Sequence, residues 1–362
     1  MMLRPHYVRM RFSSGFLVRG LTPGFHRLSR FFSDTLSRMS QQPDLVWQAS
    51  DQLKALKWPE EDLTSTAAEG GGFYPLRLGE TLDDERFVII RKLGWGGYST
   101  VWLARDLRDN RHVALKVLSA YASSQIESGR LRELDLLRKV TNASPLHCGF
   151  GHVIHLSHEF SFDSFIGRHI CFVLDVLSYS VSSLQSQLND PRLPLKFILR
   201  IMKHVLKGLE YLHDECQIVH SGMSSSCFAV IEQPMQYPTD LNPGNILLLP
   251  SDVDKVVTHE VLQHPATLYG FPKTIPPNEL PFHPVLSTPL IFGLSMNTDA
   301  GLHWVIADLG HAHFQKEHLS KIVQPYALRA PEVVLGLGWG PAIDIWSLGC
   351  MVLFLLLGCY AL

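Results

Sequence analysis

A glycine-containing turn between two β-rich stretches is the feature that most constrains the fold of this 362-residue chain. The turn lies in segment 92–101 (K-L-G-W-G-G-Y-S-T-V), after one β-rich stretch at 86–90 and before another that begins at Val101. Because glycine has no Cβ atom, Gly94 and Gly96 let a hairpin backbone come close to phosphate groups. The sequence therefore predicts a β-sheet whose hairpin carries a phosphate-binding turn.

A short apolar strand that ends in a lysine follows this turn. It reads V-A-L-K at 113–116, and Lys116 is expected to neutralise the α- and β-phosphates of a nucleotide. The alternative is a solvated lysine at the end of a strand. The glycine turn at the expected distance upstream favours the phosphate-binding interpretation.

A helix is predicted over 124–140, where apolar residues recur in three-residue steps. Glu133 precedes the apolar L-x-L-L segment that should face the core. We therefore predict that the carboxylate of Glu133 pairs with Lys116, with Glu127 and Asp135 as rival candidates.

A buried strand and a second helix lead to the next part of the site. Residues 169–176 form an apolar run that is typical of a buried strand, and they lead into a hinge at 175–177 whose backbone is expected to bind adenine. A helix is predicted over 195–213 because its apolar residues share one face. It delivers the chain to a strand at 218–220.

An interrupted loop motif follows His220. Eighteen residues (221–238) separate this histidine from T-D-L-N-P-G-N at 239–245, and the joined flanks read H-T-D-L-N-P-G-N. In phosphoryl transfer, an aspartate at the position of Asp240 orients the attacking hydroxyl, and an asparagine at the position of Asn245 holds a metal ion. The insert has no clear period, so we predict a local bulge that lies outside the fold.

Three motifs downstream complete the set. A strand at 305–307 ends in D-L-G, where Asp308 is expected to chelate Mg²⁺. A-P-E follows at 330–332, and D-I-W-S-L-G at 344–349 opens an apolar segment that continues without charge to Leu362. Such a segment is either a membrane span or a buried helix. We predict a buried helix, because no positively charged flank follows it.

In this order, the motifs resemble those of the SR-protein kinase family. The resemblance covers roughly residues 71–362, and its most specific part is K-L-G-W-G-x-x-S-T-V-W-L at 92–103. Thr239 in place of arginine, D-L-G in place of D-F-G and the long spacer before it also fit this family. The resemblance implies an α+β, two-lobed protein kinase fold, with a β-rich small lobe at 71–177 and an incomplete helical large lobe at 178–362.

The resemblance also implies an activity and its residues. The expected reaction is phosphorylation of serine in Arg/Ser-rich proteins, with splicing factors as partners, ATP and Mg²⁺ as cofactors and no direct nucleic-acid partner. The expected catalytic residues are Asp240, Lys116 and Glu133, and the expected metal ligands are Asn245 and Asp308. The nucleotide is expected to contact Gly94, Trp95, Gly96, Gly97, Val101, Ala114, Lys116, Asp175 and Leu177.

Departures from the family pattern leave alternatives open. Asn242 stands where the family usually has lysine, the insert interrupts the catalytic loop, and we expect the large lobe to be truncated at its C-terminus. The main alternative is therefore a catalytically impaired pseudokinase, or a fragment from a mis-spliced transcript, that at most binds ATP. A small-molecule kinase of the aminoglycoside phosphotransferase type is disfavoured, because the A-P-E and D-I-W motifs help build a protein-substrate groove.

A proline-rich spacer separates Asn245 from Asp308, which lie 63 positions apart. Seven prolines between 265 and 289 argue against regular structure in the spacer, at about 250–300. We therefore predict a solvated loop that wraps the large lobe.

The N-terminal segment 1–40 is basic, with seven arginines, no lysine and Asp34 as its only acid. This composition is typical of a mitochondrial transit peptide, with a disordered basic tail as the alternative. The family resemblance instead implies cytoplasm and nucleus. Residues 41–70 are expected to form a linker, and the remainder of the chain is mildly acidic, which is compatible with basic substrates.

Cysteine and histidine placement gives no strong metal signal. The six cysteines show no paired framework and are interpreted as reduced core thiols. His152, His155 and His158 suggest zinc, but steps of three put His155 on the opposite face of a strand. We therefore predict solvent-facing histidines.

Overall fold

The computed structural model describes residues 58–188, 190, 192–221, 241–268, 284–290, 302–317, 323–324 and 328–358. The segment 1–40, the linker up to residue 57, the insert after Ser221, Thr239, Asp240 and parts of the spacer lie outside the described residues. The chain divides into two compact units, 1–47 and 48–362, and all described residues belong to the second.

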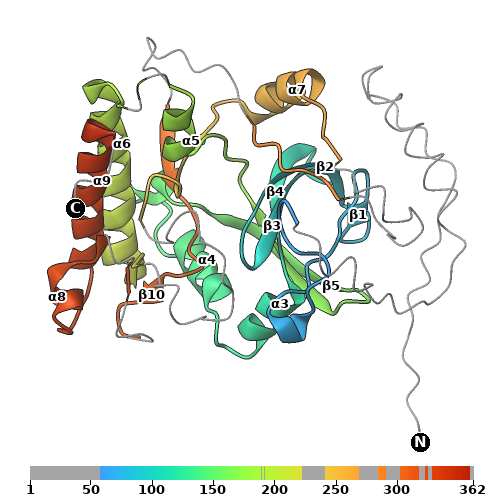
Figure 1. The fold of residues 1–362 in the computed structure, drawn as a ribbon, viewed down its shortest axis with the longest axis horizontal. Coiled ribbons are helices and arrows are strands. Elements are labelled where there is room, and N and C mark those ends of the chain that lie inside the picture. The colour runs from blue at the N-terminus through green and yellow to red at the C-terminus, as the bar shows by residue number, and fades with distance from the viewer. Residues whose placement is uncertain are drawn as a thin grey trace, which may run out of the picture. The chain divides into compact units, whose positions relative to one another are not determined.

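A six-stranded antiparallel sheet forms the small lobe, in the order β1-β2-β3-β4-β6-β5 (Figure 1). Its residues alternate between two faces. Leu103 and Phe172 belong to the main core with the α4 helix (Glu133–Asn142), whereas Trp102 and Leu115 belong to a second cluster. The strands are β1 (Thr81–Leu82), β2 (Phe87–Trp95), β3 (Ser99–Asp106), β4 (Arg111–Leu118), β5 (Leu156–Asp163) and β6 (Arg168–Leu174).

The helical stretch predicted over 124–140 is two helices, so that prediction was wrong in its continuity. A short 3₁₀ turn (η1, Ala67–Glu69) precedes the sheet, and the helices are α3 (Ala120–Glu127) and α4 (Glu133–Asn142). The break has a local cause, because Gly129 just beyond α3 takes φ +73°, a left-handed conformation that ends helices. As a result, Glu133 is the first residue of α4.

The large lobe is built around two helices, α6 (Leu195–Glu210) and α9 (Ala342–Leu357), which lie side by side (Figure 1). The predicted helix from Leu195 is confirmed, and a π-helical turn (η3, Tyr211–Cys216) continues it. Two small antiparallel pairs, β7 with β10 and β8 with β9, carry the loops of the site. The remaining elements are η2 (Phe150–His152), α5 (Val181–Ser186), β7 (Ile218–Val219), β8 (Ile246–Leu249), β9 (His303–Ile306), β10 (His313–Phe314) and α8 (Pro331–Val334).

The apolar segment predicted to be a buried helix corresponds to α9. Ile343, Met351 and Leu355 are buried, whereas Ile345 and Leu353 are 49% and 42% exposed. Within the described ranges, no helix has both the length and the apolar character to cross a membrane.

The spacer contains regular structure, which corrects the prediction of an irregular loop. The α7 helix (Val253–Gln263) is capped by Asp252, whose side chain accepts the N–H of Lys255 at 3.0 Å. The physical reason is position, because the seven prolines all follow α7 and do not interrupt it.

The described parts of the spacer contact the small lobe, and not only the large lobe as predicted. Asp254 of α7 contacts Arg105 and His112 of the sheet. Val285 is buried in the second sheet cluster, and the N–H of Thr288 donates to the carbonyl of Lys92 at 2.8 Å. The described parts of the spacer therefore pack against strands of the sheet.

Candidate active site

The register of three strands places the glycine turn beside Lys116. Val101 on β3 pairs with Gly94 on β2 and with Lys116 on β4. The N–H of Gly96 donates to the carbonyl of Ser99 at 2.8 Å and closes the turn. Residues 22 positions apart, Gly94 and Lys116, thus lie on either side of a single strand.

The glycines of this turn have open space around them. A Cβ atom added at Gly94, Gly96 or Gly97 would meet no heavy atom within 4 Å, and none of the three takes a positive φ. Neither packing nor backbone conformation therefore requires glycine here. Close approach of a ligand to the backbone is the remaining physical reason, and phosphates fit it.

Lys116 joins the two carboxylates expected around it. Its Nζ lies 2.5 Å from Oε1 of Glu133 and 3.4 Å from Oδ1 of Asp308. Lys116 and Glu133 are mostly buried, whereas the side chain of Asp308 is 38% exposed. The structure thus brings together residues from β4, the start of α4 and the D-L-G segment after β9.

The charges of Lys116 and Asp308 stabilise each other. Burial disfavours the charged form of Lys116, but the carboxylates of Glu133 and Asp308 outweigh burial and raise the pKa of Lys116. Burial also disfavours the charge on Asp308, yet Lys116 and the nearby histidines lower the pKa of Asp308 to about 2. Lys116 is therefore cationic and Asp308 anionic at neutral pH.

Asp308 is held in an unusual backbone conformation. Its φ of +59° is left-handed, which costs a non-glycine residue about 1–3 kcal/mol. Hydrogen bonds hold the segment: the N–H of Gly310 donates to Oδ1 of Asp308 at 3.3 Å, and Nε2 of His220 lies 3.3 Å from the carbonyl of Ala307. Such strain persists where the surrounding structure imposes it, and it is concentrated at functional sites.

Asn245 flanks the same two-stranded ladder as Asp308. Ile246 on β8 pairs with Ile306 on β9, and the N–H of Ala307 donates to the carbonyl of Asn245 at 2.8 Å. The ladder thus brings the two predicted metal ligands to one end of β8 and β9. Their oxygen-rich side chains suit Mg²⁺.

The departure at Asn242 has a local structural role. Asn242 is buried, and its Oδ1 accepts the N–H of Gly244 at 2.6 Å. This side chain therefore stabilises the turn that leads to Asn245. Asp240, which is predicted to orient the attacking hydroxyl, lies outside the described residues.

The predicted adenine-binding hinge follows β6. Leu174, the last residue of β6, pairs with Ala114 on β4, two residues before Lys116. Asp175 and Leu177 are partly exposed, while Val176 is buried. The strand pairing therefore places the hinge and the lysine strand next to each other.

Sequence reasoning missed the role of Asp344. This buried carboxylate accepts the N–H of His220 at 2.8 Å and that of Ser221 at 2.9 Å, and it lies 2.8 Å from Nε2 of His213. The D-I-W motif was noted in the sequence, but no local pattern indicated its partners. Asp344 therefore anchors His220 and Ser221, at the start of the predicted catalytic loop.

Comparisons with known proteins agree with this geometry. Residues 87–226 match the protein kinase domain family. A serine/threonine protein kinase of Aspergillus fumigatus is 30% identical, over 92% of this chain and 72% of the relative. The serine/threonine-protein kinase SRPK of Physarum polycephalum is 30% identical over 82% of this chain, and SRSF protein kinase 3 of Mus musculus is 34% identical over 50%.

Coverage of the relatives is partial. The chain spans 66% of the Physarum polycephalum protein, 64% of protein kinase dsk1 of Schizosaccharomyces pombe and 28% of the mouse protein. A solved crystal structure of a kinase domain superposes on 80% of this chain with a TM-score of 0.53 and 22% identity, which supports the two-lobed fold.

The family follows from the sequence relatives. The chain therefore belongs to the serine/threonine protein kinase family and is SR-protein-kinase-like.

Proposed function

We propose that this chain is an ATP- and Mg²⁺-dependent kinase that phosphorylates serine in Arg/Ser-rich proteins. The observation that carries the proposal is the cluster in which Lys116 contacts Glu133 at 2.5 Å and Asp308 at 3.4 Å. A lysine positioned by a carboxylate beside a metal-binding aspartate is the arrangement that phosphoryl transfer from a nucleotide requires.

Each residue of the cluster has one task in this proposal. Glu133 holds Lys116, which neutralises the α- and β-phosphates, and the backbone of the turn at Gly94 and Gly96 covers them. Asp240, assigned from its motif alone, orients the serine hydroxyl.

The residues present fit the two cofactors of the family. The open space around the glycine turn would admit phosphates, and the partly exposed Asp175 and Leu177 would offer backbone partners to the adenine. Asn245 and Asp308 would hold Mg²⁺, which supplies charge neutralisation at the β- and γ-phosphates when it is bound.

Two observations support an Arg/Ser-rich substrate. Relatives of this chain are named SRPK and SRSF protein kinase 3. In addition, the chain has a net charge of −2 although its first 40 residues carry seven arginines, so the remainder is acidic. Acidic surfaces favour the approach of basic substrates.

ATP titration by calorimetry tests the nucleotide site directly. Lys116→Met should weaken ATP binding by about tenfold or more, because the phosphates lose their cationic partner. Lys139→Met is the matched control, because Lys139 is exposed on α4, and it should leave the affinity unchanged. Equal affinities in wild type and Lys116→Met would contradict the assigned role.

A phosphorylation assay then tests the activity. The chain should transfer phosphate from ATP to an Arg-Ser repeat peptide and not to a Lys-Ser repeat of equal charge. ATP binding without transfer to any peptide would instead support the catalytically impaired alternative.

Location follows as a separate proposal. The family resemblance favours cytoplasm and nucleus, and the arginine-rich segment 1–40 favours mitochondria. Imaging the full chain and a chain that lacks residues 1–40, each fused at its C-terminus to a fluorescent protein, separates the two. Mitochondrial signal that depends on 1–40 would overturn the cytoplasmic and nuclear assignment.

A further inference from the structure

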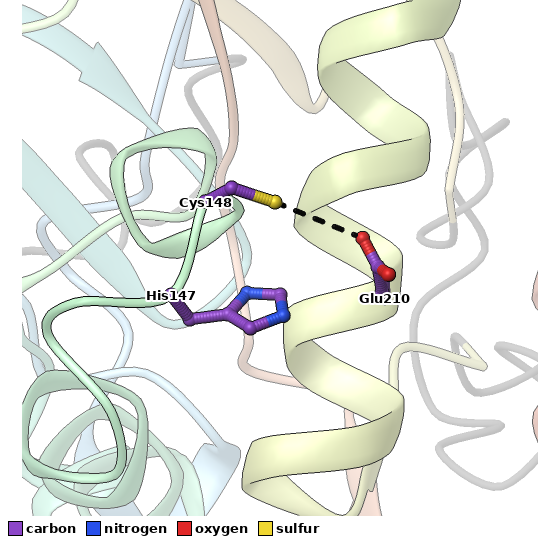
Figure 2. Close-up of side chains that lie close together, drawn as sticks. All are labelled: His147, Cys148 and Glu210. Atoms are coloured by element: carbon purple, nitrogen blue, oxygen red, sulfur yellow. Dashed lines mark hydrogen bonds between the residues drawn. The ribbon is translucent and has the colours of Figure 1, made fainter.

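A histidine, a cysteine and a glutamate that belong to none of the predicted catalytic motifs converge at one place. His147 and Cys148 lie on the loop after α4, and both side chains extend toward α6, which carries Glu210 (Figure 2). One ligand atom from each residue lies within 4.8 Å of the other two. The Sγ of Cys148 is 3.9 Å from Oε2 of Glu210.

The loop is pressed against α6 by its backbone. A Cβ atom at Gly149 would lie 1.9 Å from the carbonyl oxygen of Lys207, so only glycine fits at this point. Because Gly149 follows Cys148, and Glu210 is one helical turn beyond Lys207, this close approach brings the thiol and the carboxylate together. The two groups are therefore neighbours through the fold and not through side-chain mobility alone.

Tyr211 holds the other end of the loop. Its hydroxyl donates to the carbonyl of Val140 at 2.6 Å and accepts the N–H of Ser144 at 3.3 Å. The ring of His147 packs on that of Tyr211, with centroids 5.5 Å apart and planes 30° apart. Contacts within the protein thus position the loop and the helix that carry the three side chains without an ion. Such preorganisation favours metal binding.

We propose that His147, Cys148 and Glu210 form a binding site for a divalent zinc-type ion. Zinc accepts thiolate, imidazole and carboxylate ligands in one tetrahedral site, and neighbouring ligand atoms of such a site are about 3.3–3.7 Å apart. The observed separations need only a small contraction. Mg²⁺ and Ca²⁺ prefer oxygen ligands, so the thiol argues against them.

Binding changes the protonation of Cys148 and the hydrogen bonding of His147. The Cys148 thiol releases its proton and coordinates as thiolate, so affinity rises with pH. The Nδ1 of His147 accepts the N–H of Gly149 at 3.1 Å, and coordination exchanges this hydrogen bond for a metal–nitrogen bond. Water completes the fourth position, because three protein ligands leave it open.

The ion would join the loop after α4 to the end of α6. Glu210 is the last residue of α6, and the π-helical turn that follows leads to β7 and the start of the catalytic loop. A metal here therefore ties the helix that carries Glu133 to the segment that delivers His220.

Cobalt spectroscopy on the full chain tests the proposal. The chelator-treated, reduced protein is titrated with Co²⁺ and then with Zn²⁺. We expect one equivalent of Co²⁺ to give the visible bands of a tetrahedral ion and a thiolate-to-cobalt charge-transfer band, both removed by Zn²⁺. Zn²⁺ should also raise the melting temperature of the protein by mass action.

Variants decide which residues hold the ion. Cys148→Ser should abolish the charge-transfer band, and His147→Ala and Glu210→Gln should each weaken Zn²⁺ binding about tenfold or more. Asp214→Asn, one turn beyond Glu210 and exposed, is the matched control and should bind as wild type. A charge-transfer band that survives Cys148→Ser, or unchanged affinity in His147→Ala and Glu210→Gln, would overturn the site.

A further variant tests the scaffold apart from the ligands. Gly149→Ala keeps all three ligands but cannot keep the contact with Lys207. It should weaken Zn²⁺ binding while leaving the stability of the metal-free protein measurable by circular dichroism. Wild-type affinity in a folded Gly149→Ala protein would show that the loop contact does not organise the site.

Discussion

The carboxylate of Asp344, on α9, accepts the backbone N–H of His220 at 2.8 Å, although 124 positions separate the two residues. Oδ1 of the same carboxylate accepts the N–H of Ser221. One buried side chain thereby fixes the start of the catalytic loop to the central helix of the large lobe. The position of His220 and Ser221 thus depends on a residue that was not assigned a role in catalysis or nucleotide binding.

Replacement of Asp344 by alanine should destabilise the chain. Two buried N–H groups, those of His220 and Ser221, lose their acceptor, and each unsatisfied group costs about 1–3 kcal/mol. The expected loss in the free energy of unfolding is therefore at least about 2 kcal/mol by urea denaturation. Asp214→Ala, at an exposed aspartate, is the control and should change stability little.

The pair of Lys116 and Glu133 should show strong coupling in a double-mutant cycle. Lys116→Met leaves the buried Glu133 carboxylate without its nearest counter-charge and should cost about 3–5 kcal/mol. Adding Glu133→Gln to Lys116→Met should recover part of that loss, because the uncompensated charge is removed. Thermal unfolding of both proteins measures the difference, and a double variant less stable than Lys116→Met would contradict it.

The histidine prediction was wrong for His152, which is buried and packs against the rings of both His204 and His303, with centroids 4.4 and 4.3 Å away. Nδ1 of His204 accepts the N–H of Trp304 at 3.2 Å, so this histidine must be neutral there. Burial, followed by the charges of the neighbouring histidines, lowers the pKa of His204 to about 3.

His204 should therefore make the fold sensitive to acid. The pKa of His204 is lower in the folded protein than in the unfolded chain. Neutral His204 therefore makes its full contribution to the free energy of unfolding above about pH 6.5, and this contribution is lost as the pH falls toward 3. His204→Asn keeps an acceptor but cannot titrate, and should flatten the decline by up to about 1.4 kcal/mol per pH unit. Urea denaturation between pH 7 and pH 4 checks this, and His158→Asn is the control at a more exposed histidine. Parallel profiles of wild type and His204→Asn would refute it.

Lys92 should couple the spacer to the strand of the glycine turn. Its Nζ lies 2.5 Å from carboxylate oxygens of both Glu60 and Glu61, and the side chain is 1% exposed. Glu60 in turn accepts the N–H of Ser287 at 2.7 Å. Lys92→Met should cost about 3–5 kcal/mol, because it leaves buried carboxylates without a cation.

Limited proteolysis gives the second measurement for Lys92. Cleavage near Ser287 should accelerate in Lys92→Met, since the segment loses its anchor at Glu60. Lys139→Met, at an exposed lysine, should keep the wild-type rate. Equal cleavage rates in all three proteins would show that Lys92 does not hold the spacer.

The position of Ser221 sets where the insert is best removed. Ser221 is buried, donates its N–H to Asp344 and lies with its Oγ 2.9 Å from Nδ1 of His313, so it belongs to the fold, contrary to the predicted bulge over 221–238. Deleting 222–239 joins Ser221 to Asp240 and should raise the melting temperature and the ATP affinity, because a closed loop is removed. Lower values for both quantities would show that the insert is structural.

Local patterns in the sequence were enough to predict the strands around Lys116 and the helix from Leu195, whereas the two-lobed fold was implied by the resemblance of the ordered motifs to a kinase family. The strands and the helix depend on residues close in sequence, whose alternation or helical spacing is visible in the chain itself. The structure also has the predicted contact between Lys116 and Glu133. The two residues are only 17 positions apart, and the strand and helix that carry them are both visible as local patterns.

Only the tertiary structure decided the contacts that join distant segments. The anchor from Asp344 to His220, the placement of Thr288 on Lys92 and the approach of Gly149 to Lys207 leave no local period in the sequence. Each depends on which surfaces pack together, and packing selects partners by shape and by the burial of polar groups across the whole chain. The periodicity of a segment determines its own conformation, but the segment's neighbours determine what it contacts.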